Sequence, residues 1–357
     1  MKIGILTVHR AYNYGSVLQC YALQEYLRSQ GHDVWVVDYR QQWTEETYST
    51  FSLSKISRIY VRPKALVRYV LKTFHRYCLN RRRQAVFKNF CSHFRLTKAC
   101  GVDNIVPGFD CYIIGSDQLW SFACVGGEDP VYTGTFIHDK NSRIVGYALS
   151  SNFQSIQALG TNGLNRIISN FDKLSFREKS IISLINEYTG KTFQQVLDPT
   201  LLINEDMWFS FIEHSIWKGK KYIAVYQARG VYGDENFLIK KANTLCEQIE
   251  GKVIDMSNMT YSVEDFLSII KYAQYIITTS FHATVFSIIF ETPCFAVRLD
   301  DGYDCRYVDL LHSLGTEGEK EIVKKDFVPK PFNIDFKKMK NNLNTLRINS
   351  YEFLGNL

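Results

Sequence analysis

One histidine in this sequence stands where a strand is predicted to give way to a helix. The β-rich run "YIITT" ends at Thr279, and the apolar run "HATVFSIIF" begins at His282. Because the first N–H groups of a helix are unpaired and its dipole is positive at that end, an anion such as phosphate would be favoured beside the imidazole. Alternatively, Ser280 only caps the helix and His282 is a core histidine with satisfied hydrogen bonds.

An arginine and a glutamate follow another predicted strand. In "KLSFREKS", Arg177 and Glu178 come directly after the apolar residues. A guanidinium at this strand end would bind an anion, and the Glu178 carboxylate would orient it. The alternative is an ordinary surface ion pair. In the first interpretation, His282 and Arg177 would both be ligands of an anion.

Two polar loops in the N-terminal part are also predicted to bind substrate. Asn13, Tyr14 and Gly15 precede the first helix and form a candidate loop for an anion or a sugar, although Gly15 could serve only the turn. Ser116 and Asp117 follow the strand in "FDCYIIGSDQLW" and could hydrogen-bond sugar hydroxyls or simply cap the next turn. The sequence leaves both alternatives open for each loop.

The familiar short motifs of several enzyme classes are absent. We find no G-x-G-x-x-G, Walker loop, H-E-x-x-H or G-x-S-x-G pattern, so generic dehydrogenases, kinases, metalloproteases and hydrolases lose their usual support. The nine cysteines contain no C-x-x-C pair, which argues against a disulfide framework and a structural zinc site. We therefore expect no metal and no cofactor.

The elements that must position these residues form two α/β series. "KIGILTV", a helix that Ser16 is predicted to cap and that ends before Gly31, and "DVWVVDY" make a βαβ unit, which requires a parallel sheet. A second series begins at "KYIAVYQ". We predict two doubly wound, Rossmann-like domains, 1–205 and 206–335, with a ligand cleft between them, and a tail, 336–357, that packs back on the first domain.

Basic residues are concentrated in one segment of the 357-residue chain. The net charge is +6, yet residues 47–102 hold 13 Lys and Arg and no Asp or Glu. This segment is predicted to be a helical insertion, either lying on an anionic membrane surface or solvated and partly packed. Nucleic acid is not an expected partner, because no recognised fold motif accompanies the charge. No apolar run approaches the roughly 20 residues of a membrane span, and a cytoplasmic location, with peripheral attachment to the inner membrane face as an option, is expected.

Several of these stretches resemble the polysaccharide pyruvyl transferase family when they are taken together. "HRAYNYGSVLQCYALQEYL", "IIGSDQLW", "LSFREKS", "LDPTLL" and "TTSFHATVFSIIFETP" occur in the family's order and approximate spacing. The resemblance covers the chain from Met1 to about Leu314, except for the basic segment. It implies two Rossmann-like domains arranged like a GT-B glycosyltransferase.

The resemblance also implies an activity: transfer of the pyruvyl unit of phosphoenolpyruvate onto a sugar as a cyclic ketal, in capsule or exopolysaccharide synthesis. His282 matches the family histidine implicated in phosphoenolpyruvate binding and catalysis, and Arg177 matches the arginine of its serine–x–arginine–glutamate motif. The resemblance thus makes His282 and Arg177 the predicted catalytic residues. Better characterised members have an arginine directly before that histidine, whereas this sequence has Phe281. Arg306 is also predicted to bind substrate.

Two other functions are compatible with the same expected fold. One is a glycosyltransferase that uses a nucleotide sugar, and the other is a non-catalytic protein that binds a glycan or a lipid-linked precursor. For the leading hypothesis the expected partners are phosphoenolpyruvate and a sugar or lipid-linked oligosaccharide acceptor.

Overall fold

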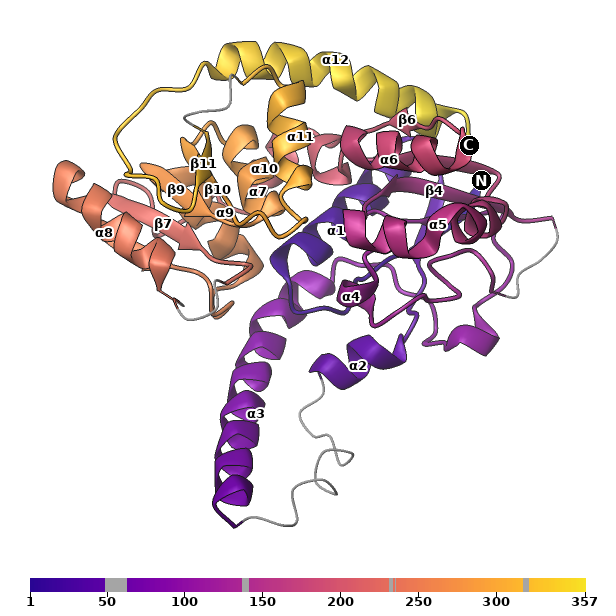
Figure 1. Cartoon of the computed structure of the whole chain (residues 1–357), viewed down its shortest axis with the longest axis horizontal. Helices are drawn as coiled ribbons and strands as arrows, with labels where there is room; N and C mark the ends of the chain where they lie inside the picture. Colours follow the sequence, from indigo (N-terminus) through magenta and orange to yellow (C-terminus); the bar gives the residue numbers. More distant parts are fainter. Residues whose placement is uncertain (49–62, 137–140, 231–233, 235, 317–320) are drawn as a thin grey trace.

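The fold contains two parallel β-sheets, each packed with helices (Figure 1). The computed structural model describes residues 1–48, 63–136, 141–230, 234, 236–316 and 321–357. The predicted α/β class with two Rossmann-like domains is confirmed, and the sheets fall on either side of residues 204–220.

The N-terminal sheet has six strands in the order β2-β1-β3-β4-β5-β6. Its strands are β1 (Lys2–Leu6), β2 (Asp33–Val36), β3 (Cys111–Ile114), β4 (Arg143–Leu149), β5 (Lys173–Phe176) and β6 (Gln194–Gln195). The helices of this half are α1 (Tyr14–Ser29), α2 (Gln42–Tyr48), α3 (Pro63–Cys91), α4 (Phe122–Val125), α5 (Phe153–Ile168) and α6 (Lys179–Thr189). Short 3-10 helices cover Val102–Asn104 and Pro199–Leu201.

The C-terminal sheet has five strands in the order β11-β10-β9-β7-β8. Its strands are β7 (Tyr222–Tyr226), β8 (Lys252–Asp255), β9 (Tyr275–Thr278), β10 (Cys294–Arg298) and β11 (Ile322–Lys324). The helices are α7 (Glu205–Ser210), α8 (Phe237–Ile249), α9 (Val263–Tyr272), α10 (Phe281–Ile289), α11 (Cys305–Ser313) and α12 (Phe336–Gly355).

Both sheets reverse their strand order at one place. The reversal lies between β1 and β3 in the first sheet and between β7 and β9 in the second. In doubly wound folds the loops at the carboxyl ends of the strands on either side of such a switch point form the ligand crevice. The fold therefore directs attention to the loops that follow these four strands.

A continuous apolar core joins the two halves. Tyr14 at the start of α1 is fully buried, stacks on Phe266 of α9 with ring centroids 4.2 Å apart, and donates its hydroxyl to the Tyr261 carbonyl at 2.8 Å. Phe87 and Phe90 of α3 are buried in the same cluster. The end of the basic segment is thus part of the core between the sheets, and Tyr14 is a contact between the two halves and not the predicted substrate-binding residue.

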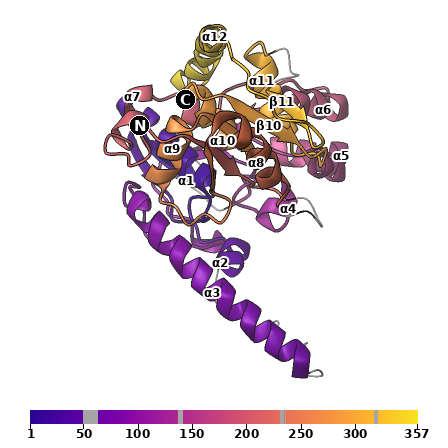
Figure 2. The same ribbon diagram turned by 90° about the vertical axis from the view of Figure 1, so that its left-hand side faces the viewer.

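The rest of α3 extends away from the body of the protein (Figures 1 and 2). Residues 49–62 of the basic segment lie outside the described residues, so its attachment to a membrane stays a prediction. Among the helices that the structure describes, none combines the length and hydropathy needed to cross a bilayer.

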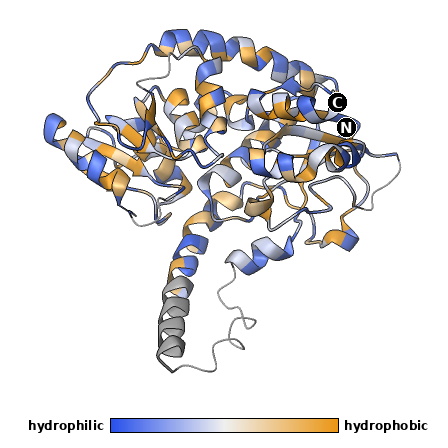
Figure 3. Cartoon of the chain, in the orientation of Figure 1, coloured by the Kyte–Doolittle hydropathy of each residue, from blue (hydrophilic) through white to orange (hydrophobic). Residues whose placement is uncertain are grey.

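The C-terminal helix returns to the first sheet. Phe353 of α12 is buried, its carbonyl accepts a hydrogen bond from Lys173 Nζ at 2.8 Å, and Ser350 Oγ accepts one from the Leu197 backbone at 2.9 Å. Hydrophilic and apolar residues are interspersed along the whole of α12, as expected for a helix that packs one face on the protein (Figure 3).

Candidate active site between the two sheets

A cavity of about 260 Å³ lies where the two switch points meet. The loop after β1 contributes Asn13 and the loop after β3 contributes Asp117, while Ser280 and His282 follow β9 and Arg306 comes from α11. The volume lies just below the range of about 300–1,000 Å³ that is typical of sites for drug-sized ligands. Residues from opposite ends of the chain therefore share one site.

Two helices begin at this cavity. The side chain of Asn13 caps α1 by accepting from the Gly15 backbone N–H at 2.9 Å, and Ser280 caps α10 by accepting from Ala283 at 3.3 Å. Ser16, the predicted cap of α1, instead donates its hydroxyl to Asp117 at 2.8 Å. The prediction for Ser16 was wrong because the helix cap, Asn13, lies three residues earlier. Two positive dipole ends thus face the cavity and favour an anion there.

The imidazole of His282 packs directly on Gly15. A Cβ at position 15 would lie 2.0 Å from His282 Nδ1, far inside van der Waals contact. Gly15 lies within α1, so its backbone does not demand glycine. The glycine is needed because the ring occupies the space that a side chain would fill. Neither of the alternatives considered for Gly15, a substrate loop or a turn, describes this role.

Asp198 is the carboxylate at the centre of the site, and sequence reasoning did not assign it. Its Oδ2 lies 3.5 Å from His282 Nε2, accepts a hydrogen bond from Ser116 Oγ at 3.2 Å, and pairs with Arg177 Nη1. Thr200 donates to the other oxygen. Burial acts to raise the pKa of the Asp198 carboxyl, but His282 and Arg177 outweigh it and hold this pKa below its ordinary value. Asp198 therefore orients the imidazole as a buried anion.

Arg177 supports Asp198 and does not line the cavity. Its guanidinium is buried, lies 4.5 Å from the centre of the Phe281 ring, and sits between the carboxylates of Asp198 and Glu178. Arg177 was predicted to bind the anionic substrate directly. In the structure, aromatic and acidic side chains surround its guanidinium instead. Phe281, which replaces the family's arginine, provides that cover.

Glu178 and Ser116 are likewise buried behind the cavity. Glu178 accepts a hydrogen bond from Ser150 Oγ at 2.8 Å, and burial, only partly offset by Arg177, raises the pKa of Glu178 to about 7. Ser116 is fully buried and donates to Ala148 and Asp198. Both were predicted to touch substrate, yet their polar atoms face other protein groups.

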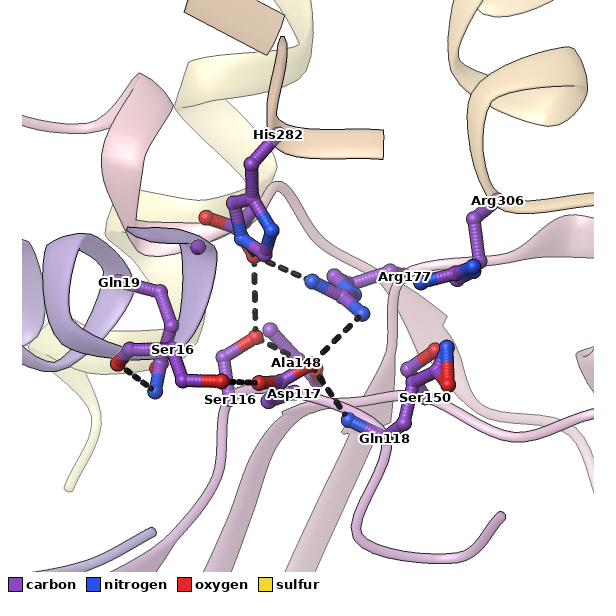
Figure 4. Close-up of polar contacts among 12 residues, drawn as sticks. Ser16, Gln19, Ser116, Asp117, Gln118, Ala148, Ser150, Arg177, His282 and Arg306 are labelled. Carbon is purple, nitrogen blue, oxygen red and sulfur yellow. Dashed lines mark hydrogen bonds and ion pairs between the residues drawn. The ribbon is translucent and has the colours of Figure 1, made fainter. Parts of the chain in front are cut away.

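Arg306 is the cation that does line the cavity. Its Nε donates to the Tyr303 carbonyl at 3.0 Å, and the Gln118 side chain, with its amide oxygen turned toward Arg306, accepts from the same Nε at 3.1 Å. Burial, followed by the positive charges of Arg229 and Arg177, lowers the pKa of Arg306, which as an arginine still stays protonated. No carboxylate among the described residues forms an ion pair with it, and Figure 4 shows its side chain extending toward Arg177.

The structure divides the predicted site residues into two groups. Those that line the cavity are Asn13, Asp117, Ser280, His282 and Arg306. Those that lie behind it or in the core are Tyr14, Gly15, Ser116, Arg177 and Glu178.

Gln118, Asp198 and Arg229 were missed. The Asp-Pro pair after a predicted strand marks Asp198 as a cap, which is a weak signal for a site. Arg229 follows β7, and Asp301 and Asp304 hold its guanidinium beside the cavity, an arrangement that no local pattern shows. In the described part of the chain, no group of three or more His, Cys, Asp and Glu residues is placed to hold a metal ion.

Solved structures with a similar course of the chain include sugar-processing enzymes. The SsfS6 glycosyltransferase of Streptomyces sp. SF2575 is 11% identical, with a TM-score of 0.43 and coverage of 99% of this chain and 96% of that one. UDP-GlcNAc 2-epimerase of Methanocaldococcus jannaschii, solved with UDP-GlcNAc and UDP, is 10% identical, with a TM-score of 0.46 and coverage of 97% and 93%.

The sequence itself gives the clearer assignment. No curated protein sequence matches this chain significantly. The family model described as polysaccharide pyruvyl transferase matches residues 13–301. This span includes every residue that lines the cavity except Val8, Ala11 and Arg306. Since this span is most of the 357 residues, the chain belongs to the polysaccharide pyruvyl transferase family and is a transferase.

Proposed function

We propose that this protein transfers the pyruvyl group of phosphoenolpyruvate to a sugar of a surface-polysaccharide precursor, forming a ketal and releasing phosphate. One observation carries the proposal beyond the family assignment. The cavity combines an arginine that forms no ion pair with a carboxylate of the described residues, two helix N-termini and a buried His282–Asp198 pair. The cavity thus offers Arg306 and two helix N-termini to an anionic donor and an imidazole for proton transfer.

Phosphoenolpyruvate carries a phosphate and a carboxylate, and both would be attracted to this cavity. Arg306 can donate two parallel hydrogen bonds to either group. The free N–H groups at the start of α10 supply a second anion site beside His282. Because Phe281 covers Arg177, Arg306 takes the place of the cation that the family carries before the histidine.

The reaction requires protons at defined atoms. Protonation of C3 makes C2 electrophilic, a sugar hydroxyl forms a bond to C2, the C2–O bond to phosphate breaks, and a second hydroxyl closes the ketal. Of the two hydroxyl protons, one balances the proton gained at C3 and the other balances the departing phosphate. His282 is placed to move these protons, while Asp198 holds its ring through Nε2 and Arg177 balances the Asp198 charge.

The test is phosphate release from phosphoenolpyruvate with free and lipid-linked galactose, mannose and N-acetylmannosamine acceptors. We expect release that depends on the acceptor, and a product whose mass increases by one ketal-linked pyruvyl group. Calorimetry with phosphoenolpyruvate and with UDP-sugars runs in parallel. Binding and turnover of a UDP-sugar, with none of phosphoenolpyruvate, would replace this proposal by a glycosyltransferase function. Sugar binding without turnover of either donor would indicate a glycan-binding protein.

A further inference from the structure

A second concavity of about 510 Å³ adjoins the cavity across α4. We call it the α2–α4 groove; among the described residues its walls include Tyr39, Gln42, Trp43, Asp103, Val125 and Glu128. Val125 lines both concavities, while Cys124 before it faces the cavity and Gly126 after it faces the groove. Figure 1 shows α2 next to α4. Val125, a buried residue of α4, is therefore the wall that the groove and the cavity share.

Trp43 presents an aromatic surface in this groove. It lies in α2, and it is 37% exposed although the chain buries Trp120 and Trp208 completely. The indole packs closely on Gly126, because a Cβ at that position would lie 2.2 Å from Trp43 Cγ and Cδ1. A flat and solvent-facing indole is suited to pack against the apolar face of a pyranose ring.

The groove is lined by more acidic than basic residues, whereas the cavity is lined by one of each, Asp117 and Arg306, beside His282. The groove is lined by four acidic residues, Glu46, Asp103, Glu128 and Asp129, and one basic residue, Arg40. Arg40 is itself paired with Asp38 at 3.1 Å, and Glu128 is paired with Arg166 at 2.8 Å. Carboxylates accept hydrogen bonds from hydroxyl groups and repel anions. The groove is therefore suited to an uncharged sugar and unsuited to a phosphate or a uronic acid.

On the basis of the proposed function, we propose that the α2–α4 groove binds the acceptor glycan as an uncharged pyranose stacked on Trp43. The sugar unit that is modified then extends past Val125 into the cavity. This arrangement keeps the anionic donor beside Arg306 and the neutral acceptor beside the carboxylates. The charge of each compartment selects its own substrate.

Kinetics of a variant with a shortened side chain test the stacking. With the acceptor that supports phosphate release, Trp43→Ala should raise the acceptor KM by about tenfold or more, as for a buried aromatic anchor, and leave the phosphoenolpyruvate KM unchanged. Trp43→Tyr should restore most of the loss. Ile216→Ala, at a residue that is 67% exposed elsewhere on the surface, is the control. An acceptor KM that stays at the wild-type value in Trp43→Ala overturns the inference.

Binding without catalysis separates this inference from the proposed function. Saturation-transfer NMR with methyl galactoside and methyl mannoside, in the absence of donor, should detect binding that Trp43→Ala abolishes and Arg306→Gln retains. The corresponding methyl uronides should bind more weakly. Such binding supports the groove even if the wild type never turns over phosphoenolpyruvate. The groove would be refuted as the acceptor site if Trp43→Ala left glycoside binding unchanged, or if uronides bound as well as neutral glycosides. Turnover of phosphoenolpyruvate in the same preparation would leave the proposed function intact.

Discussion

Replacement of Gly15 by alanine tests the placement of His282 with a single methyl group. The added Cβ would lie 2.0 Å from Nδ1, 2.5 Å from Cγ and 2.7 Å from Cε1 of the imidazole. Favourable contacts between non-bonded carbon atoms lie near 3.5–4.0 Å. The ring and the helix start must therefore separate by roughly 1.5 Å to remove the overlap.

The expected loss is in activity more than in stability. A displacement of about 1 Å in a catalytic group can cost about 10²-fold in rate, and here it also disturbs the 3.5 Å contact between His282 and Asp198. Overpacking typically costs about 1–3 kcal/mol, and the helical preference of alanine over glycine offsets up to about 1 kcal/mol of this. We expect kcat/KM to fall about a hundredfold in a protein that remains folded.

The assay is acceptor-dependent phosphate release, with urea unfolding measured on the same preparations. Gly355→Ala is the matched control, since Gly355 also lies in a helix and a Cβ there would meet no atom within 4 Å. A Gly15→Ala enzyme with the wild-type kcat/KM would show that the reaction does not depend on the position of the imidazole, and the catalytic role of His282 would have to be abandoned.

Four further outcomes are expected. His282→Gln should lower kcat by about 10²–10⁴-fold with little change in unfolding free energy, and retention of kcat would exclude proton transfer by this residue. Arg306→Gln should raise the phosphoenolpyruvate KM by about 10–100-fold, the value of a charged hydrogen bond, while the surface variant Arg28→Gln should not. The pKa of Glu178 is raised to about 7 in the folded protein, so protonation of this carboxyl stabilises the fold. This stabilisation is complete below about pH 4.5 and is lost as the pH rises through 7. Between pH 5 and pH 8 the free energy of unfolding in urea should fall by up to about 3 kcal/mol more for the wild type than for Glu178→Gln. The same pH dependence of unfolding free energy in both proteins would contradict this. The basic segment, with 13 cations between residues 47 and 102, should give salt-sensitive co-sedimentation with anionic vesicles, and absence of binding at low salt would refute attachment to a membrane.

Local sequence patterns determined the fold class and one side of the site. Apolar strands, the helix between the first two strands and the turn residues at their ends are properties of neighbouring residues, so they predict two parallel sheets. The change from "YIITT" to "HATVFSIIF" likewise placed Ser280 as a cap and His282 in the first turn of α10. The loops at the ends of strands were found for the same reason.

Only the tertiary structure decided which of these residues face the cavity. Gly15 and His282 meet because the two sheets pack with their switch points together, and no pattern within either segment records that contact. The same packing places Phe281 over Arg177 and turns a predicted substrate ligand into a buried partner of Asp198, while Arg306 from α11 becomes the cation at the cavity. The exposure of a side chain depends on which distant segments of the chain pack against it. The roles of the charged residues are therefore decided by the three-dimensional structure.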